Sequence, residues 1–343
     1  MRMIPERAPA TTAVSLDAFH DVWPRAFPIE ELRRLLGEHA DALVAEVLAR
    51  QVNAPVWTLV ERGGKRWRTT IGRLAYRVAG GAAPEPEPVF EVPELLHNAS
   101  LAIDDIEDAA TERRGGPPVH LAHGLPVALN AANAAYFRAL AVLRGILPDA
   151  ARLRALDMLG DEMFAAHLGQ ALDLSLGATA KLGVGLEEKH YVALVRAKTG
   201  ALIRIAARLG AIAADAPEPV ERALADWAGH LGVAYQIRDD AEDIAEGSTD
   251  LEACRMTYPL LLALASPDPA DARRLREQLG DAKPGKAARR ARDEIFTRLR
   301  VVERSLEAAR EAANRATLAL AALPAGESRA AMIELTLRLA EIP

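Results

Sequence analysis

Two aspartate clusters constrain this chain more than any other feature of its sequence. The first is DDIED, from Asp104 to Asp108, and the second is DDAED, from Asp239 to Asp243, so the form DDxxD occurs twice at a separation of 135 residues. On a helix, positions i, i+1 and i+4 share a broad face, so the three aspartates of each cluster point toward one region of space. Because like charges at this spacing repel, a stable fold has to place a cation or open solvent beside each cluster.

Magnesium is the cation that these clusters favour. Carboxylate oxygens are hard ligands, no cysteine or group of histidines accompanies them, and Mg²⁺ commonly bridges carboxylates to substrate phosphates. An acidic run on a helix is most often a solvated face. Here apolar residues, among them Ile103 and Ile237, lead into both clusters, which favours inward-facing carboxylates. We expect two facing clusters to clamp a magnesium-bound diphosphate through Asp104, Asp105, Asp108, Asp239, Asp240 and Asp243.

The rest of the chain predicts an all-α fold. Alanine, leucine, arginine and glutamate dominate, aromatic residues make up only 4%, and apolar residues recur at helical spacing, as between Ala201 and Leu209. A chain of 343 residues with 50% hydrophobic content can bury a large core. No linker separates the two clusters, so we expect one helical domain over residues 18–343. Residues 1–17, with Pro5 and Pro9, are expected to form a flexible arm.

Charge, cysteine content and hydropathy exclude several classes of protein. The net charge is −6 and nothing resembles a basic stripe, so nucleic-acid binding is not expected. The single cysteine, Cys254, rules out an intrachain disulfide and is compatible with a reducing cytoplasm. No run of about eighteen uncharged apolar residues occurs, so no membrane-spanning helix is expected. These features are typical of a cytoplasmic enzyme that acts on small molecules.

Several shorter motifs accompany the clusters, and together they resemble the trans-isoprenyl diphosphate synthases. In chain order they are GGKRWR at 63–68, HNASLAI at 97–103, RRG at 113–115, GQ with an aspartate at 169–173, KTG at 198–200 and YQIR at 235–238. The resemblance covers roughly residues 60 to 265 and is specific, because the motifs agree in identity and order. From His97 to Asn133 the chain is most similar to geranylgeranyl diphosphate synthases.

The resemblance implies a fold, a reaction and a set of partners. The fold is the isoprenoid synthase helical bundle around a central apolar cavity, and the family forms homodimers. The reaction joins an allylic diphosphate to isopentenyl diphosphate and depends on three Mg²⁺ ions in each site. The residues that carry over as catalytic are Asp104, Asp105, Asp108, Lys198 and Asp239.

The basic residues of the motifs match the family's diphosphate-binding positions. Lys198 is expected to oppose the charge of the leaving diphosphate, with Thr199 and Gln236 in support, and Arg113 matches the position that contacts the allylic diphosphate. The isopentenyl diphosphate site is expected to consist of Lys65, Arg68, His97 and Arg114. Basic residues near glycine turns suit phosphate oxygens. Taken alone, Gly-Gly-Lys-Arg is equally typical of a solvated turn and of a phosphate-binding turn. A single histidine is more often a core residue than a substrate-binding one.

Two small residues precede the first cluster at the positions that set product length in the family. Ser100 and Ala99 are the fourth and fifth residues before Asp104. Bulky aromatic residues there tend to stop the product at fifteen carbons. Their absence therefore predicts a product of twenty carbons or more, unless Tyr136, Phe137 or Phe164 closes the cavity from another helix.

The chain departs from the family pattern after the second cluster. The loop expected over residues 244–253 is short and contains no lysine, although the family usually has one there. Arg255 stands where a second family lysine precedes a Thr-x-Pro, which keeps the charge and changes its geometry. We count Arg255 among the predicted substrate-binding residues.

Two other functions stay open on these residues. A class I terpene cyclase of the same fold would use the same ionisation machinery without a second diphosphate site. A non-catalytic partner subunit of a prenyl synthase is expected to show eroded aspartates, and both clusters here are complete.

Overall fold

The computed structural model describes residues 16–246, 250–281 and 283–340, and every regular element within these ranges is a helix. Beside the helices they contain one isolated bridge, between Arg113 and Gly116. The predicted all-α class is therefore confirmed. The expected arm over residues 1–17 lies outside the described residues except for its last two, and helix α1 begins at Asp17.

The chain divides into two compact units, which we describe separately. Unit 1 comprises Met1–Thr70 and Pro86–Ile146, and unit 2 comprises Ile71–Glu85 and Leu147–Pro343. The expectation of a single domain over residues 18–343 stays a prediction. Each unit carries one of the two aspartate clusters.

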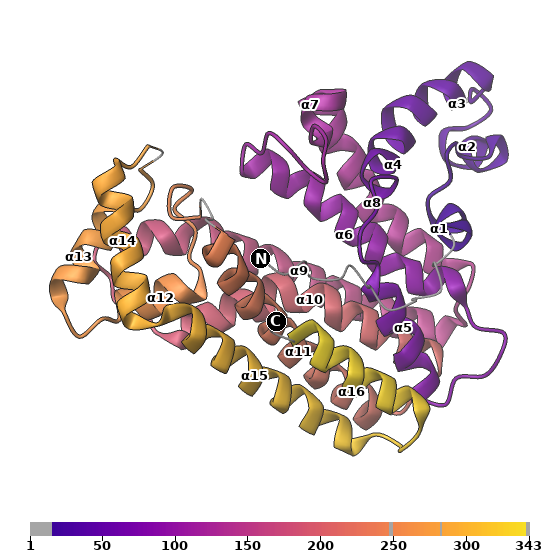
Figure 1. The fold of residues 1–343 in the computed structure, drawn as a ribbon. Coiled ribbons are helices and arrows are strands. Elements are labelled where there is room, and N and C mark those ends of the chain that lie inside the picture. The colour runs from indigo at the N-terminus through magenta and orange to yellow at the C-terminus, as the bar shows by residue number, and fades with distance from the viewer. Residues whose placement is uncertain (1–15, 247–249, 282, 341–343) are drawn as a thin grey trace, which may run out of the picture. The chain divides into compact units, whose positions relative to one another are not determined.

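Unit 1 is built around the helix that carries the first cluster (Figure 1). Its elements are α1 (Asp17–Val22), α2 (Ile29–Leu36), α3 (Ala42–Leu48), the π-helix η1 (Ala49–Asn53), α4 (Ala54–Val60), α6 (Glu87–Glu107), α7 (Val119–His123) and α8 (Leu125–Arg144). Helix α6 packs on α8, which buries the small residues Ala128, Ala131 and Ala135. It ends at the cluster, where Asp108 is the C-cap and Ala109 takes a left-handed conformation with φ 50°.

Unit 2 is organised around four long helices that lie side by side, α9, α10, α11 and α15 (Figure 1). Its elements are α9 (Asp149–Lys181), α10 (Glu188–Ala213), α11 (Glu218–Glu246), α12 (Tyr258–Leu264), α13 (Pro269–Gln278), α14 (Lys286–Leu299), α15 (Val301–Ala319), the 3₁₀-helix η2 (Leu320–Ala322) and α16 (Glu327–Ala340). Helix α5 (Trp67–Val78) begins in unit 1 and continues into unit 2. Because α11 continues to Glu246, the loop expected from Ile244 begins later than predicted.

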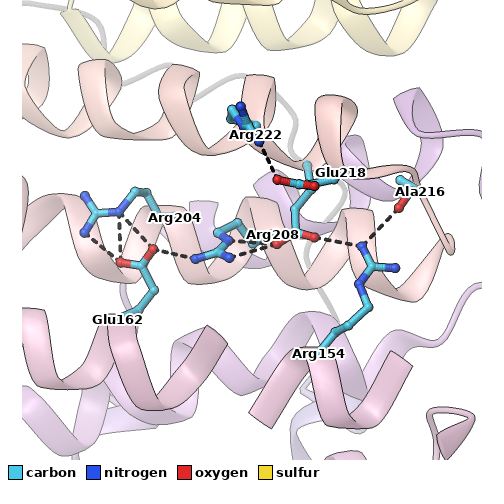
Figure 2. Close-up of polar contacts among 8 residues, drawn as sticks. Arg154, Glu162, Arg204, Arg208, Ala216, Glu218 and Arg222 are labelled. Atoms are coloured by element: carbon cyan, nitrogen blue, oxygen red, sulfur yellow. Dashed lines mark hydrogen bonds and ion pairs between the residues drawn. The ribbon is translucent and has the colours of Figure 1, made fainter. Parts of the chain in front are cut away.

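Largely buried ion pairs join three of these long helices (Figure 2). On α9, Glu162 accepts from Arg204 Nε at 2.9 Å and from Arg208 Nη1 at 3.0 Å, both on α10. Arg208 also donates to Glu221 on α11, and the same carboxylate accepts from Arg154 on α9 at 2.8 Å. Arginines and glutamates alternate along this network, so each buried charge has an opposite neighbour.

Candidate active site

The three carboxylates of the first aspartate cluster differ in how far they are buried. Asp105 has no exposed surface, and its Oδ1 accepts from Arg113 Nε at 2.7 Å and Nη2 at 2.5 Å. Asp104 is half-buried on the last turn of α6, and Asp108 is exposed just beyond it. Asp105 therefore points toward protein, and Asp104 and Asp108 carry the accessible carboxylates of this cluster.

Several predicted diphosphate-binding residues of unit 1 come together around His97. Burial lowers the pKa of His97 well below its usual value, and the positive charges of Arg68, Arg114 and Arg113 lower it further. The imidazole is thus neutral at neutral pH and can both donate and accept a hydrogen bond. Asp105 pairs with Arg113 and Glu94 lies close to Arg114, so the three guanidinium groups still exceed these two carboxylates beside the neutral ring, which suits a site for an anion. Lys65 is exposed on the preceding turn.

A tight turn before α5 brings Arg114 close to the backbone. Gly64 has φ 146°, and a Cβ atom there would lie 3.1 Å from Arg114 Nη2. Arg114 Nη1 also donates to the Leu59 carbonyl at 2.8 Å and to Asn98 Oδ1 at 3.1 Å. These contacts explain why a glycine at position 64 suits the packing of the Arg114 side chain against this turn.

Three residues that the sequence did not single out position this basic group. Arg62 Nη1 donates to the carbonyl oxygens of Arg113 at 3.2 Å and Pro117 at 2.6 Å, which holds the turn after the first cluster. Asn98 orients Arg114, and Glu94 accepts from the backbone N–H of Arg68 at 3.2 Å. Asn98 lies inside the HNASLAI motif, so the motif contained this signal, whereas Arg62 and Glu94 have no local pattern.

The predicted chain-length residues lie on α6 before the cluster. Ala99 is buried, with 1% of its surface exposed, and Ser100 is half-buried with its hydroxyl donating to the His97 carbonyl at 2.9 Å.

On α8, burial together with the charges of Asp104 and Glu107 raises the pKa of Tyr136, so its phenol stays protonated near the first cluster.

The second cluster, in unit 2, repeats the division seen in the first. Asp240 is buried, and its carboxylate accepts from the Tyr191 hydroxyl at 2.6 Å, Gln236 Nε2 at 2.9 Å and the Tyr258 N–H at 2.8 Å. Burial outweighs these donors and raises the pKa of Asp240 to about 7. Asp239 is half-buried and Asp243 exposed, so the second aspartate is again the inward-facing one.

Asp173 brings two predicted diphosphate-binding cations of unit 2 together. Its Oδ2 accepts from Lys198 Nζ at 2.6 Å and from Arg255 Nη1 at 2.9 Å. The three side chains come from α9, α10 and the segment before α12, and all are largely buried. The sequence placed Asp173 in a motif without assigning it a role, and here it aligns the two cations.

Glycines allow α9, α10 and α11 to approach closely enough to connect these residues. A Cβ atom at Gly169 would lie 2.3 Å from the backbone nitrogen of Lys198, and one at Gly232 would lie 2.8 Å from the Cα of Gly200. Next to these contacts, the Thr199 hydroxyl donates to Gln236 Oε1 at 2.7 Å. Thr199 and Gln236 thus link α10 to the helix of the second cluster.

The chemistry of the accessible aspartates fits magnesium held together with a substrate. Within the described residues, no group of three histidine, cysteine, aspartate or glutamate side chains is arranged to hold a metal ion by itself. Mg²⁺ usually keeps several waters and binds one or two carboxylates together with phosphate oxygens. Asp104 with Asp108, and Asp239 with Asp243, offer such carboxylates at i and i+4.

The fold and these residues define a class of protein: an all-α protein with a DDxxD cluster at the end of two helices and arginines gathered around a buried histidine. The family described as Polyprenyl synthetase matches residues 49–295. The chain belongs to the polyprenyl synthetase family, which confirms the class of enzyme expected from its motifs. None of the helices within the described residues is long and apolar enough to cross a membrane.

Individual relatives support this assignment. A geranylgeranyl pyrophosphate synthase from Eremothecium gossypii is 31% identical over 230 residues, which cover 64% of this chain and 70% of the relative. The solved polyprenyl synthase from Caulobacter crescentus, complexed with calcium and isoprenyl diphosphate, is 27% identical with a TM-score of 0.75, covering 95% of this chain and 98% of that one. The geranylgeranyl pyrophosphate synthetase from Geoglobus acetivorans is 26% identical with a TM-score of 0.77 and covers the same shares.

Proposed function

We propose that this protein is a trans-prenyltransferase that joins an allylic diphosphate to isopentenyl diphosphate, with a product of twenty carbons or more. The observation that carries this proposal is the group formed by Arg68, Arg113 and Arg114 around His97 in unit 1. A terpene cyclase ionises one diphosphate and needs no second site. A prenyltransferase has to hold a second diphosphate that stays intact, and Arg68 and Arg114 of this group supply the positive charge for it.

Ionisation of the allylic substrate requires that negative charge developing on the leaving diphosphate be neutralised. When bound, Mg²⁺ would supply Lewis-acid neutralisation of that charge, and each cluster would hold it through its own carboxylates, Asp104 with Asp108 in unit 1 and Asp239 with Asp243 in unit 2. Lys198 and Arg255 donate hydrogen bonds to the leaving group. Asp173 holds these two cations at one carboxylate oxygen, so both are aligned before the substrate binds.

Arg68 and Arg114 bind the diphosphate of isopentenyl diphosphate, with Lys65 at the exposed edge. His97, held neutral by its surroundings, contributes a hydrogen bond and no further charge. The double bond of this substrate attacks C1 of the allylic cation and forms a carbon–carbon bond, which leaves a new cation on the isopentenyl unit. The carbon next to this new cation then loses a proton to the released diphosphate. Atoms and charge balance without an external oxidant or reductant.

The buried aspartates of both clusters act as positioning residues in this proposal. Asp105 fixes Arg113, which would contact the allylic diphosphate. Asp240 accepts from the backbone N–H of Tyr258 and so fixes the start of α12, three residues after Arg255. Ala99 and Ser100 leave room for a growing chain before the first cluster, which supports a product beyond fifteen carbons.

We further propose that the enzyme is a homodimer. Helix α8 exposes an apolar stripe that includes Leu125, Leu129 and Phe137, the last with 73% of its surface exposed. Helix α9 exposes Phe164 and Leu168 in the same way. Large apolar residues at helical spacing on an exposed face are typical of a protein interface.

A reducing compartment suits the free thiol of Cys254, and we assign the enzyme to the cytoplasm.

Removal of one accessible aspartate from either cluster tests the proposal. We expect Asp104→Ala and Asp239→Ala to lower turnover about 100-fold or more, because each removes a carboxylate that would hold Mg²⁺. The fold should survive, since the change relieves repulsion between like charges. Asp226→Ala, at an exposed aspartate of α11, is the matched control and should leave turnover unchanged. Near-normal turnover in either cluster variant would contradict the assignment.

A further inference from the structure

Arg238 links the helix of the second cluster to the last helix of the chain. It directly precedes Asp239 on α11, and only 9% of its surface is exposed. Its Nη1 donates to the carbonyl oxygen of Leu339 on α16 at 2.9 Å, and its Nη2 lies 3.1 Å from Glu242 Oε2. Arg238 is thus held at both ends of its guanidinium group, and one of these contacts leaves α11 altogether.

The link matters to α16 because Leu339 lies in its last turn. The last four carbonyls of a helix have no donor within the helix. Leu339 and Ala340 are 8% and 5% exposed, so water has limited access to this end. The guanidinium of Arg238 donates to the Leu339 carbonyl, and its positive charge complements the dipole of α16 near the end of its described range. A second hydrogen bond, from Trp227 Nε1 to Thr336 Oγ1 at 2.9 Å, joins the same two helices.

The link matters to the cluster because of its position around α11. At 3.6 residues per turn, successive side chains are rotated by about 100°, which places Gln236, Asp239, Asp240 and Asp243 within an arc of about 100°. Arg238 projects from the other side of the helix, roughly 100° to 160° from each of them. On the cluster's own side, Asp240 is held by Tyr191 and Tyr258. The end of α11 is therefore fixed on two sides, which leaves little freedom for it to rotate.

We infer that Arg238 is a positioning residue for metal binding. By capping α16, it fixes the rotation of the last turns of α11 and so directs the accessible carboxylates of Asp239 and Asp243 toward the cation. This inference rests on the proposed function, in which these aspartates hold Mg²⁺. It assigns to α16, which lies outside all the sequence motifs, a direct part in the geometry of the site.

Three variants separate positioning from general stability. Arg238→Met removes the donor and keeps the length of the side chain, and Arg238→Lys keeps one donor and the charge. Arg222→Met is the matched control, because Arg222 lies on the same helix and forms an exposed ion pair with Glu218 (Figure 2). All proteins are compared by circular dichroism at a temperature well below their unfolding transitions.

The first readout is binding of Mn²⁺ in the presence of inorganic diphosphate, measured by electron paramagnetic resonance of the free ion. We expect Arg238→Met to weaken binding about ten-fold, as loss of an outer contact to a metal site commonly does. Arg238→Lys and Arg222→Met should stay within about two-fold of the unchanged protein. The Mg²⁺ concentration that gives half of the maximal rate should rise in parallel, while the rate at saturating Mg²⁺ falls much less.

Equal Mn²⁺ affinity in folded Arg238→Met and Arg222→Met would overturn the inference. If Arg238→Met does not fold, Arg238→Gln, whose shorter side chain falls short of Leu339, is judged by the same criterion. The wild-type protein distinguishes failure of this inference from failure of the proposed function.

If the wild-type protein binds Mn²⁺ with diphosphate and forms product, but the Arg238 variants match it, only the positioning role is wrong. If it shows neither binding nor turnover, the proposed function is wrong and the inference falls with it.

Discussion

Asp105 and Asp240 occupy the same place in their clusters, and both are buried among protein donors rather than directed outward. An isolated carboxylate cannot be buried cheaply, so each is compensated, Asp105 by Arg113 and Asp240 by Tyr191 together with two other donors. Their neighbours on the same turn stay accessible. A DDxxD cluster in this chain thus combines one carboxylate that fixes the helix with two that face solvent or ligand.

The residue at position 99 gives a prediction about product length. Ala99→Phe places an aromatic ring five residues before Asp104, at a position that borders the growing product in the proposed function. We expect shorter products, detected by mass analysis of the diphosphates. Because Ala99 is buried, the substitution also costs about 1 to 3 kcal/mol of stability. Ser100→Phe, at the half-buried neighbour, is the companion variant, and an unchanged product distribution in both would remove these positions from the cavity wall.

Glu91 gives a prediction about pH. It is fully buried on α6 beside Arg66, and burial raises the pKa of its carboxyl from 4.5 to about 7. Between these values the folded chain keeps a proton that the unfolded chain releases, so the free energy of unfolding falls as pH rises. The slope is at most about 1.4 kcal/mol per pH unit, or about 3 kcal/mol over the window.

Glu91→Gln removes this titration. The free energy of unfolding of this variant, relative to that of the wild-type protein, should therefore increase as the pH rises from 5 to 7. Urea unfolding at pH 5, 6 and 7 measures the difference. Glu112→Gln, at an exposed glutamate of the same unit, is the control and should follow the unchanged protein at every pH. Parallel curves for Glu91→Gln and Glu112→Gln would show that Glu91 is ionised throughout.

Single residues differ in how far the sequence could predict them. The DDxxD spacing predicts which aspartates share a face, because that depends only on helix geometry. It could not separate Asp105 from Asp104, because burial depends on Arg113 eight positions away. Arg62 and Asp173 act through partners 25 to 82 residues distant, for which no local pattern exists.

At the scale of elements, the contacts between helices α9, α10 and α11 place Lys198, Thr199 and Gln236 relative to one another. Two kinds of contact maintain this arrangement. Glycines at 169 and 232 permit backbone approach, and the arginine–glutamate network of Figure 2 joins the same helices. The helical nature of these segments was predictable from apolar spacing and composition, whereas their mutual packing depends on residues distant in sequence.

The network gives a prediction about stability. Glu162→Gln leaves Arg204 and Arg208 without their shared carboxylate, and loss of one partner from a buried ion pair typically costs about 3 to 5 kcal/mol. Glu218→Gln disrupts only the exposed pair with Arg222 and should cost less than about 1 kcal/mol. Chemical denaturation of both variants measures the two costs. Equal, small losses would mean that the network contributes little to holding these helices together.

At the scale of the whole molecule, the exposed apolar faces of α8 and α9 predict how the chain assembles. Phe137→Arg and Phe164→Arg place a charge on these faces, and each should convert a dimer to a monomer, because a charge buried in an apolar interface costs several kcal/mol. Light scattering after size-exclusion chromatography gives the mass directly. Leu318→Arg, at an equally exposed leucine of α15, is the control. If all three variants keep the mass of the unchanged protein, α8 and α9 are not the interface.

The central claim is that the protein extends an allylic diphosphate with isopentenyl diphosphate, and product analysis tests it most directly. Purified protein is incubated with Mg²⁺ and geranyl or farnesyl diphosphate, with and without isopentenyl diphosphate, and both diphosphates and hydrocarbons are analysed by mass spectrometry. We predict diphosphates that grow by five-carbon steps only when isopentenyl diphosphate is present, up to twenty carbons or more. A hydrocarbon or alcohol formed equally in its absence would contradict the claim and identify a terpene cyclase.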